Sequence, residues 1–449
     1  YKNSAKSFQK WYNVVTQKKH QDKKGFCTMT QYTTLNHNLK RGILRFSEKI
    51  SKDFSKPLQN FITQMLFGIL SCQESKLSWI ARSLDEKAIL KKVIERLSRN
   101  LKSFESGGKL FENYLNTVKG VIGDKSILVI DGGDITKNCA TKMEGIASVR
   151  DGSTGEYRKG YHTLGITALT SERKLPIPVY TKVFTSEEEG FVSEDEEVLN
   201  GLRFLSKHFK KGNIRTFDRG FDCNQYYKYL LSHRENFVIR AKKNRDVLYQ
   251  GEKINILKLA QKFKGKYSLK FTKKNGTITD CKISVIPIKL PCRPQDDLNL
   301  VVCYGFGNVP MMLITNLKSD DKRLSIAVVK VYLMRWKIEE YYRFKKQQFN
   351  LEDMRVRSLN SIRNLELLIT VAVGYIGFVS EKCEERITVM QLIECSKRIF
   401  GTNKFIFYAV ADGLFALLAK YKQGINHMLF NSPKPPQLQL SLFGTQPFA

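Results

Sequence analysis

Residues 126–131 have the sequence SILVID, a short and almost wholly apolar run that ends in a carboxylate. An apolar run of this length, followed by a Gly-rich turn, is typical of a buried strand, and it predicts that the strand ends at Asp131. A second such run, residues 214–217, is followed by another aspartate, Asp218. The sequence therefore predicts two buried strands that each carry an aspartate at the carboxyl end.

The segments around these two runs complete a mixed α/β pattern. Strands are predicted at Tyr161–Leu169, Pro178–Phe184 and Phe237–Arg240, and helices at Glu194–His208 and Tyr226–Ser232. Three strands joined by short turns, followed by strand, helix and strand, are typical of a mixed sheet that is flanked by helices. We therefore predict an α/β fold in which three antiparallel strands are followed by parallel ones.

The two flanks of this region differ in their periodicity. Residues 1 to about 118 have apolar positions at three- and four-residue spacing, which predicts helices. Residues 242–318 alternate apolar and polar side chains, with a hairpin turn predicted at Asn275-Gly276 and a strand that ends at Pro287. From about Leu324 to residue 430 the pattern is helical again, so the chain carries a β-rich insertion between two helical regions.

Basic residues lie between the apolar stripes of the N-terminal helices. They include Lys76, Arg82, Lys91, Lys92, Arg96, Arg99 and Lys102. Two short helices joined near Ser83 and followed by a basic helix would suit a helix-turn-helix-like reader of DNA. A helical bundle with a solvated basic face explains the same pattern, and the periodicity leaves both interpretations open.

The charge balance indicates a polyanionic partner. The 449 residues include 75 Lys and Arg against 43 Asp and Glu, which gives a formal net charge of +32. The hydrophobic fraction of 42% is enough for a sizeable core and excludes a disordered basic tail protein. A globular chain with this charge is expected to bind nucleic acid first and an anionic membrane surface second.

The apolar stretches and the cysteines indicate where the protein is located and which metal ligands it can offer. The longest apolar stretch, Leu367–Val379, is shorter than the roughly 18 residues that span a bilayer, and the polar, Lys-rich first twenty residues do not resemble a signal peptide. The nine cysteines show no Cys-x-x-Cys spacing, and the six histidines are isolated. We therefore expect no membrane association, a cytoplasmic protein, and any metal ion held by oxygen ligands.

A helix predicted at Leu324–Gln348 carries the residues that indicate chemistry. Tyr332, Arg335, Glu339 and Lys346 stand at offsets of 0, 3, 7 and 14. At about 100° per residue they fall within a sector of roughly 60°, so one helix face carries all four. The neighbouring Glu340 points about 100° away, which favours Glu339 as the carboxylate beside the cations.

A carboxylate beside cations makes chemical sense if it holds a divalent metal ion while the cations hold DNA phosphates. Asp131, Asp218 and Glu339 supply three oxygen-donor side chains from two strand ends and one helix. Three such ligands can bind two Mg²⁺ ions about 3.5–4 Å apart, with Mn²⁺ as a substitute. One ion would then activate a water or a 3′-hydroxyl and the other would stabilise the leaving oxygen, so no protein nucleophile is needed.

These residues resemble a known family. The spacing within YLMRWKIEEYYRFKK (332–346) resembles the YREK signature of the DDE transposases of bacterial insertion sequences, in particular insertion-sequence family four. ILVIDGGDITK resembles the block of the first Asp, and IRTFDRGFD resembles the block of the second. A β-rich insertion between the second Asp and the Glu is also a feature of that family. The resemblance covers roughly residues 50 to 430.

The resemblance implies a fold, a reaction and a role for each residue. Asp131, Asp218 and Glu339 would be the catalytic, metal-binding triad of a ribonuclease-H-like fold related to retroviral integrases. Tyr332, Arg335 and Lys346 would contact phosphates at the transposon end, and Trp336 would pack near the DNA end. The implied enzyme catalyses cut-and-paste transposition by strand cleavage and strand transfer at inverted repeats. In relatives the freed 3′-hydroxyl first forms a hairpin.

Each assignment has a competing structural interpretation. Asp134 competes with Asp131, and we choose Asp131 because it directly follows the apolar strand. Tyr332 and Trp336 are also explained as core aromatics, an interpretation that suits Trp336 better. A cluster just after the last predicted sheet strand, Arg240, Lys242, Lys243 and Arg245, is a candidate for DNA binding, although a charge run is often only a solvated surface.

The last residues carry a separate signal. Gln439, Leu440, Leu442 and Phe443 lie in the peptide QLSLF after a Pro-rich spacer. The peptide resembles those with which bacterial replication and repair proteins bind the sliding clamp, and an extended peptide of this kind suits a preformed hydrophobic cleft. The alternative is a loosely ordered terminal segment.

With these interpretations we divide the chain into six parts. They are a helical DNA-binding region (1–118), the first part of the catalytic core (119–241), the β-rich insertion (242–318), the second part of the core with the Glu helix (319–385), a C-terminal helical region suited to dimerisation (386–431) and a flexible tail (432–449). The expected partners are transposon-end and target DNA, a second copy of the chain on DNA, and the sliding clamp, in a bacterial, nucleoid-associated setting. The alternatives are a domesticated DNA-binding protein that no longer cuts, and a related nuclease without strand transfer.

Overall fold

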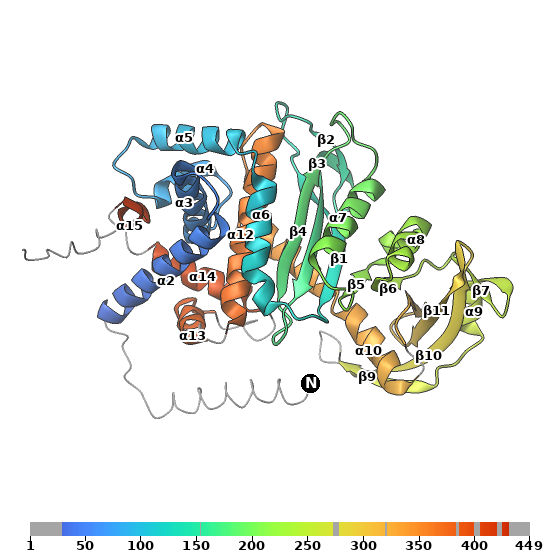
Figure 1. Cartoon of the computed structure of the whole chain (residues 1–449). Helices are drawn as coiled ribbons and strands as arrows, with labels where there is room; N and C mark the ends of the chain where they lie inside the picture. The colour runs from blue at the N-terminus through green and yellow to red at the C-terminus, as the bar shows by residue number, and fades with distance from the viewer. Residues whose placement is uncertain are drawn as a thin grey trace, which may run out of the picture. The chain divides into compact units, whose positions relative to one another are not determined.

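The structure, a computed structural model, describes residues 29–152, 154–272, 278–318, 321–382, 386–398, 405–419 and 424–430. The chain divides into two compact units, residues 1–42 and 43–449, and helix α2 (Met29–Ile50) contributes residues to both. The second unit contains a mixed sheet with helices packed against it (Figure 1). The tail peptide at 439–443 and the turn predicted at Asn275-Gly276 lie outside the described residues.

The centre of the sheet has three antiparallel strands followed by two parallel ones. β3 (Tyr157–Leu169) pairs antiparallel with β1 (Ile127–Thr136) on one edge and with β4 (Pro176–Phe184) on the other. β5 (Ile214–Phe217) runs parallel to β1, and β6 (Asn236–Arg240) runs parallel to β5. A short strand, β2 (Ala147–Arg150), extends the edge that holds β4. The predicted α/β, ribonuclease-H-like fold class is confirmed.

The first strand is longer than predicted, and the expectation that it ends at Asp131 is wrong. β1 continues through the expected Gly-rich turn to Thr136, because β3 remains hydrogen-bonded to it as far as the pair Thr136 and Gly160. Its pairing with β5, in contrast, ends at Ile130. Asp131 therefore lies at the point where the parallel pairing ends, inside a strand that continues on its other edge.

The strands of the predicted insertion extend the same sheet. They are β7 (Asp246–Tyr249), β8 (Glu252–Asn255), β9 (Tyr267–Thr272), β10 (Ile278–Leu290), β11 (Arg293–Tyr304) and β12 (Met311–Thr315), with a short helix α9 (Ile256–Gln261) between β8 and β9. β12 pairs antiparallel with β6, and β11 and β10 follow it outward. The insertion is therefore continuous with the central sheet through main-chain hydrogen bonds.

One strand of the insertion also passes its predicted end. β10 continues beyond Pro287 to Leu290. At Pro287 the strand pairs with β11 on one edge only, because its pairing with β9 covers residues 278–283 and its pairing with β7 is at Lys289. A missing amide hydrogen is tolerated on an edge without a partner, which explains the proline.

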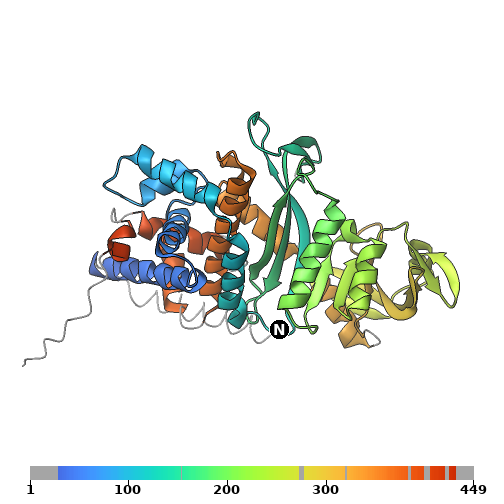
Figure 2. The same ribbon diagram turned by 45° about the horizontal axis from the view of Figure 1, so that its top comes forward.

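Helices from both ends of the chain share one core. α3 (Lys56–Cys72), α4 (Leu77–Ser83), α5 (Leu90–Ser103) and α6 (Gly107–Val118) precede the sheet, and α12 (Leu359–Glu381), α13 (Arg386–Cys395), α14 (Phe407–Leu418) and α15 (Asn426–Phe430) follow it. α12 packs against α3, α5, α6, α14 and strand β4. Figure 2 shows α12 between the N-terminal helices and the sheet.

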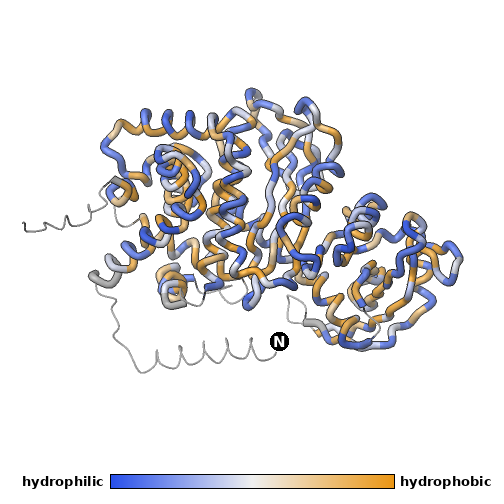
Figure 3. Tube along the Cα trace, viewed as in Figure 1, coloured by the Kyte–Doolittle hydropathy of each residue, from blue (hydrophilic) through white to orange (hydrophobic). Residues whose placement is uncertain are grey.

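The central helix α12 explains the longest apolar stretch. It is 23 residues long and apolar enough to cross a membrane by length and composition, which corrects the estimate from residues 367–379 alone. However, 89% of its most apolar window is buried within the structure, as in the core helix of a globular protein. Hydrophobic residues follow α12 and the central strands (Figure 3).

The other two helices of the sheet region connect strands of the sheet. α7 (Glu194–His208) follows β4, and α8 (Asn224–Ser232) connects β5 to β6. α7 packs against β3, where Gly201 faces Leu164, Ile166 and Tyr180. Ser193 caps α7 by accepting a hydrogen bond from the backbone of Glu196. Its first turn is acidic, which stabilises the positive end of the helix dipole.

The single helix predicted at Leu324–Gln348 is in fact two helices. α10 (Lys322–Leu333) and α11 (Trp336–Gln348) are separated at Met334 and Arg335. The Met334 amide shares its hydrogen between the carbonyls three and four residues before it, and the Arg335 amide donates only to the carbonyl three residues before it, as in the tighter 3₁₀ helix. Each helix buries its apolar side in a different place. Val328 and Val329 of α10 join the core of the insertion strands, whereas α11 packs along β1, α12 and α14.

Candidate active site

The register of the parallel strands brings the first two carboxylates together. Ile130 of β1 stands opposite Phe217 of β5, so Asp131 and Asp218 are the next residues on neighbouring strands. Adjacent parallel strands lie about 4.8 Å apart, and residues in register point to the same face. Asp218 caps the short 3₁₀ turn Arg219–Phe221 with extended backbone. The pairing of β1 with β5 therefore brings together two acids that are far apart in the sequence.

Arg335 joins these two acids to the third. Its Nη1 lies 3.3 Å from Asp131 Oδ2, and its Nη2 donates to Glu339 Oε1 at 2.7 Å. Its Nε lies 3.9 Å from Asp218 Oδ1. The side chain of Arg335 is only 7% exposed, which favours direct charge pairing over solvation. Three carboxylates that are far apart in sequence thus contact a single guanidinium.

Two tyrosines hold the carboxylates in position. Tyr332 donates its hydroxyl hydrogen to Asp218 Oδ1 at 2.8 Å. Tyr342 donates to the backbone carbonyl of Asp131 at 2.8 Å and lies over Gly165, where a Cβ atom would collide with its hydroxyl. Sequence reasoning missed Tyr342. The available signal was its position three residues after Glu339, together with a glycine on the strand that faces Asp131.

The two aspartates have opposite pKa shifts. Burial raises the pKa of Asp131 to about 7; Arg335 opposes this rise, and Asp218 and Glu339 add to it. Burial also raises the pKa of Asp218, but Arg335, the backbone amide of Arg219 and the Tyr332 hydroxyl outweigh it. The pKa of Asp218 therefore lies below its ordinary value. The two pKa values differ mainly because Asp131 is more deeply buried: its side chain is 20% exposed, and that of Asp218 is 37% exposed.

The carboxylate oxygens of Asp131, Asp218 and Glu339 are suitable ligands for divalent cations. Among the described residues, no group of three carboxylate, His or Cys side chains lies close enough to hold an ion as it stands. Instead, three carboxylates contact one guanidinium, which leaves negative charge uncompensated. Burial, together with the charges of Asp218 and Glu339, raises the pKa of Asp131. Oxygen ligands with excess negative charge are what Mg²⁺ and Mn²⁺ prefer. A metal ion would take over the neutralisation that Arg335 provides.

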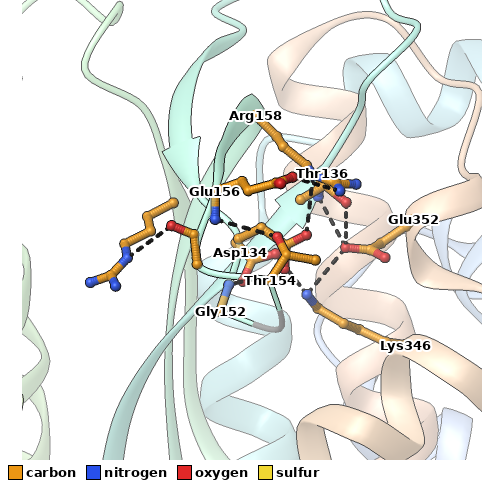
Figure 4. Close-up of polar contacts among 11 residues, drawn as sticks. Asp134, Thr136, Gly152, Thr154, Glu156, Arg158, Lys346 and Glu352 are labelled. Carbon is orange, nitrogen blue, oxygen red and sulfur yellow. Dashed lines mark hydrogen bonds and ion pairs between the residues drawn. The ribbon is translucent and has the colours of Figure 1, made fainter.

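Lys346 of α11 contacts β1 at Asp134, three residues after Asp131. Its Nζ lies 2.7 Å from Asp134 Oδ2 and 3.1 Å from Glu352 Oε1 (Figure 4). The Glu352 carboxylate also accepts from the backbone amide and the hydroxyl of Thr136. Asp134 further accepts from the amide of Gly152 in the turn between β2 and β3. Lys346 therefore ties α11 to β1 and to that turn, and Asp134 serves this cluster.

The remaining predicted residues lie in different surroundings. Trp336 begins α11 and is 47% exposed, so it is not a core aromatic. Glu340 pairs with Lys337 and not with Arg335. Arg240 is close enough to help lower the pKa of Asp218, and Lys242 is exposed.

Arg245 differs from its basic neighbours. Its guanidinium contacts Asp222 and Asn224 and lies over the ring of Tyr227, and its side chain is 12% exposed. Asp222 is buried and also accepts from the Tyr227 hydroxyl and the Lys242 amide. The contacts of Arg245 thus hold the segment that follows β6 against the turn that follows β5.

The comparison with protein families decides what the site belongs to. The family model described as "Transposase DDE domain" matches residues 122–373, which is more than half of the chain. The chain belongs to the DDE transposases. The matched range includes Asp131, Asp218 and Glu339, together with all the strands of the sheet.

Other comparisons add little to this transposase assignment. Among solved structures, the chain is similar to the piggyBac transposase in a synaptic complex with hairpin DNA. The identity is 10% and the TM-score 0.40, over 88% of this chain and 82% of that chain. The comparison with curated proteins finds no match. For a DDE transposase, the family implies DNA transposition activity, transposon-end DNA as the substrate and divalent metal ions.

Proposed function

We propose that this DDE transposase moves an insertion sequence by cut-and-paste transposition and belongs to insertion-sequence family four. The observation that carries the proposal is the convergence of Asp131, Asp218 and Glu339 on one guanidinium. Tyr332, Arg335, Glu339 and Lys346 supply the YREK pattern in the expected order. A strand-rich insertion lies between the second Asp and the Glu, as in that family.

The three carboxylates would hold two Mg²⁺ ions, or Mn²⁺ in their place. When bound, such ions activate the attacking oxygen and neutralise charge on the leaving oxygen. Tyr332 and Tyr342 keep Asp218 and the backbone of Asp131 in place, so the ligands are positioned before the substrate arrives. Arg335 would turn from the carboxylates to a DNA phosphate, since a guanidinium suits bidentate phosphate binding.

Other side chains near the triad are proposed to bind DNA. Trp336 offers an exposed ring for stacking against an unpaired base at the cut end. Arg240 and Lys242 would contact the backbone beside Asp218. Arg245 is proposed to bind the DNA backbone while it remains paired with Asp222. Lys346 would bind a phosphate only if it gave up its contact with Asp134 or Glu352.

The partners of the reaction are proposals as well. Two ends must be held together, so a homodimer on DNA is expected. The tail peptide with Gln439, Leu440, Leu442 and Phe443 is proposed to bind the bacterial sliding clamp and would keep the enzyme in the nucleoid-associated part of the cytoplasm. Deleting residues 437–449 should abolish capture of the chain by immobilised clamp and leave transposition in vitro unchanged. Unchanged capture would refute the assignment of the peptide.

A single assay tests the central proposal. The full chain is incubated with Mg²⁺, a labelled duplex that carries the inverted-repeat end of its own element, and a plasmid target. We expect nicking at the end, followed by joining of the 3′-end to the plasmid. Binding without nicking would support the domesticated DNA-binding alternative, and nicking without joining would support a nuclease.

A further inference from the structure

A groove of about 810 Å³ lies away from the catalytic carboxylates, beside the N-terminal end of α12. Its walls come from α4, α5, the segment before β2 and the segment between α11 and α12. Five of its lining residues are cations and one is an acid. They are Lys76, Lys102, Lys142, Arg355 and Arg357, with Glu144 as the acid.

Most of this positive charge is not neutralised by the protein. Lys76 pairs with Asp353 at 2.6 Å, but the other four cations form no ion pair with any residue that the structure describes. The Glu144 carboxylate accepts from the backbone amide of Leu359, in the first turn of α12. Its charge is therefore met by the positive end of the helix dipole. The groove keeps a strong positive potential, which suits a polyanion.

The groove also offers neutral hydrogen-bond donors and a fixed shape. Four serines line it: Ser78, Ser98, Ser358 and Ser361. Hydroxyl groups and cations together are the usual donors to phosphate oxygens in DNA complexes. Its walls are joined by hydrogen bonds, since the Asn364 side chain donates to the carbonyls of Leu101 and Phe104 at 2.9 and 2.7 Å. The donors are therefore preorganised.

The basic surface continues along α5. A neighbouring hollow of about 670 Å³ is lined by Lys92, Arg96 and Arg99, and it shares Ile94 and Ser98 with the first groove. The acid Glu95 also lines this hollow and pairs with Lys92 at 3.4 Å, and Arg96 is bound to Glu86. Arg99 is exposed and forms no ion pair with a described residue. Arg99 thus extends the unpaired cations of the first groove along α5, and such an extended set fits an extended polyanion better than it fits a single small anion.

The catalytic elements lead directly to this groove. α11 runs beside β1 from the Arg335–Asp131 contact to the Lys346–Asp134 contact. Beyond their ends, Lys137 Nζ donates to the Met354 carbonyl at 2.7 Å, just before Arg355. From Asp131 to Thr136 the strand rises by roughly 16 Å. At 3.4 Å per base pair this is on the order of five base pairs of DNA.

We propose that this groove binds the phosphate backbone of the transposon-end DNA about five or more base pairs from the cleaved bond. The inference rests on the proposed function, because it names where the substrate of that site continues. It assigns a DNA-binding role to Lys142, Arg355 and Arg357, which lie outside the triad and its YREK helix. Because contacts to phosphate carry no sequence information, we expect the contribution of the groove to be independent of the base sequence.

The test is the salt dependence of binding, measured on the full chain in EDTA. The variant Lys142→Glu/Arg355→Glu/Arg357→Glu is compared with Lys258→Glu/Lys262→Glu/Lys264→Glu, which changes the net charge equally at exposed positions on and after α9. Fluorescence anisotropy with a labelled 30-base-pair duplex gives Kd between 50 and 200 mM KCl. Each lost phosphate contact lowers the slope of log K against log salt by about 0.9.

We expect the groove variant to lower the slope by about 3 and to weaken binding on the order of 100-fold at 0.1 M KCl. The α9 control should keep most of the wild-type slope. An unchanged slope in the groove variant, or an equal loss in the control, would overturn the proposal. The variant Arg355→Gln/Arg357→Gln gives the same comparison if the triple variant does not fold, with an expected slope change of about 2. Because EDTA prevents cleavage, this result is independent of whether the enzyme joins DNA.

Discussion

At the scale of single residues, the site is governed by an imbalance of charge. Among the described residues, Arg335 is the guanidinium in contact with Asp131, Asp218 and Glu339, and burial is the largest cause of the cost of ionising Asp131. An unfavourable arrangement of like charges is typical of functional sites, because binding of the ligand relieves it. The stability of the protein without metal should therefore respond differently to the loss of each carboxylate.

Neutralising Asp131 should stabilise the protein without metal, whereas neutralising Asp218 should destabilise it. With a folded pKa near 7, above the ordinary value, Asp131 makes folding less favourable as the pH rises from about 4 to about 7. The pKa of Asp218 is lowered, so its ionised form makes folding more favourable, and that contribution is lost as the pH falls through its folded pKa. In EDTA at pH 7.5, Asp131→Asn should raise Tm and Asp218→Asn should lower it. Equal shifts would contradict this account.

Glu339 and Glu340 form a matched pair for testing the third ligand. Glu339→Gln should abolish Mg²⁺-dependent nicking, since an amide binds a divalent cation far more weakly than a carboxylate, while DNA binding in EDTA stays within about threefold. Glu340→Gln removes the same charge from the neighbouring position, where the partner is Lys337, and should keep nicking activity. A collapse of DNA binding in Glu339→Gln would mean that Glu339 is a structural residue.

At the scale of elements, α11 is fixed along β1 by polar contacts on one side and by a buried ion pair on the other. Lys346 contacts Asp134 and Glu352, while its neighbour Lys345 contacts Glu366 of α12 and donates to Thr370 at 2.8 Å. Burial alone would lower the pKa of Lys346, but Asp134 and Glu352 raise it above its ordinary value. Both lysines therefore remain charged in the folded protein.

The contact between Lys346 and Asp134 can be measured by a double-mutant cycle. Lys346→Ala should lower the free energy of unfolding because it leaves the buried Asp134 without its cation, and Lys346→Ala/Asp134→Ala should cost less than the sum of the single changes. We expect a coupling of about 1–3 kcal/mol from urea unfolding. A coupling near zero would indicate that Lys346 is available to DNA without exchange.

The buried pair on the other side of α11 should behave as a unit. Lys345 and Glu366 are 2% and 1% exposed, and Glu366 also accepts from Thr181 of β4 at 2.7 Å. Glu366→Gln leaves a buried ammonium without its counter-charge and should cost about 3–5 kcal/mol. Lys345→Met/Glu366→Leu removes both charges and should cost much less. Similar losses of Tm in the two variants would refute the paired role.

At the scale of the whole molecule, α12 is where distant parts of the chain meet. Gly374 lies under Tyr114 of α6, whose hydroxyl donates to the carbonyl of Pro178 in β4 at 3.0 Å. α14 packs against both α3 and α12, and Gln348 of α11 donates to Asp412 of α14 at 2.7 Å. The regions predicted from sequence as N-terminal, catalytic and C-terminal thus share one core.

Two glycine substitutions should show how tightly this core is packed. A Cβ atom at Gly374 would collide with the Tyr114 ring and disturb its hydrogen bond, so Gly374→Ala should cost about 1–3 kcal/mol. Gly108→Ala in α6 meets no atom within 4 Å and should stabilise the protein by about 0.4–1 kcal/mol. The signs are read from Tm under one buffer condition. Stabilisation by both changes would mean that α12 packs more loosely than described.

The sequence by itself determined the local features, because apolar runs and periodicity depend on neighbours in the chain. α7 and β5 have the predicted ends, and the three acids were proposed from expected strand ends and helix spacing. The tertiary structure decided what depends on pairing. It extended β1 beyond Asp131 because β3 stays bonded to it, divided the predicted helix at Arg335 because its halves bury different faces, and joined the insertion to the sheet through β12. It also placed Tyr342 on Asp131 and Lys346 on Asp134, since contacts across about two hundred residues leave no local pattern in the sequence.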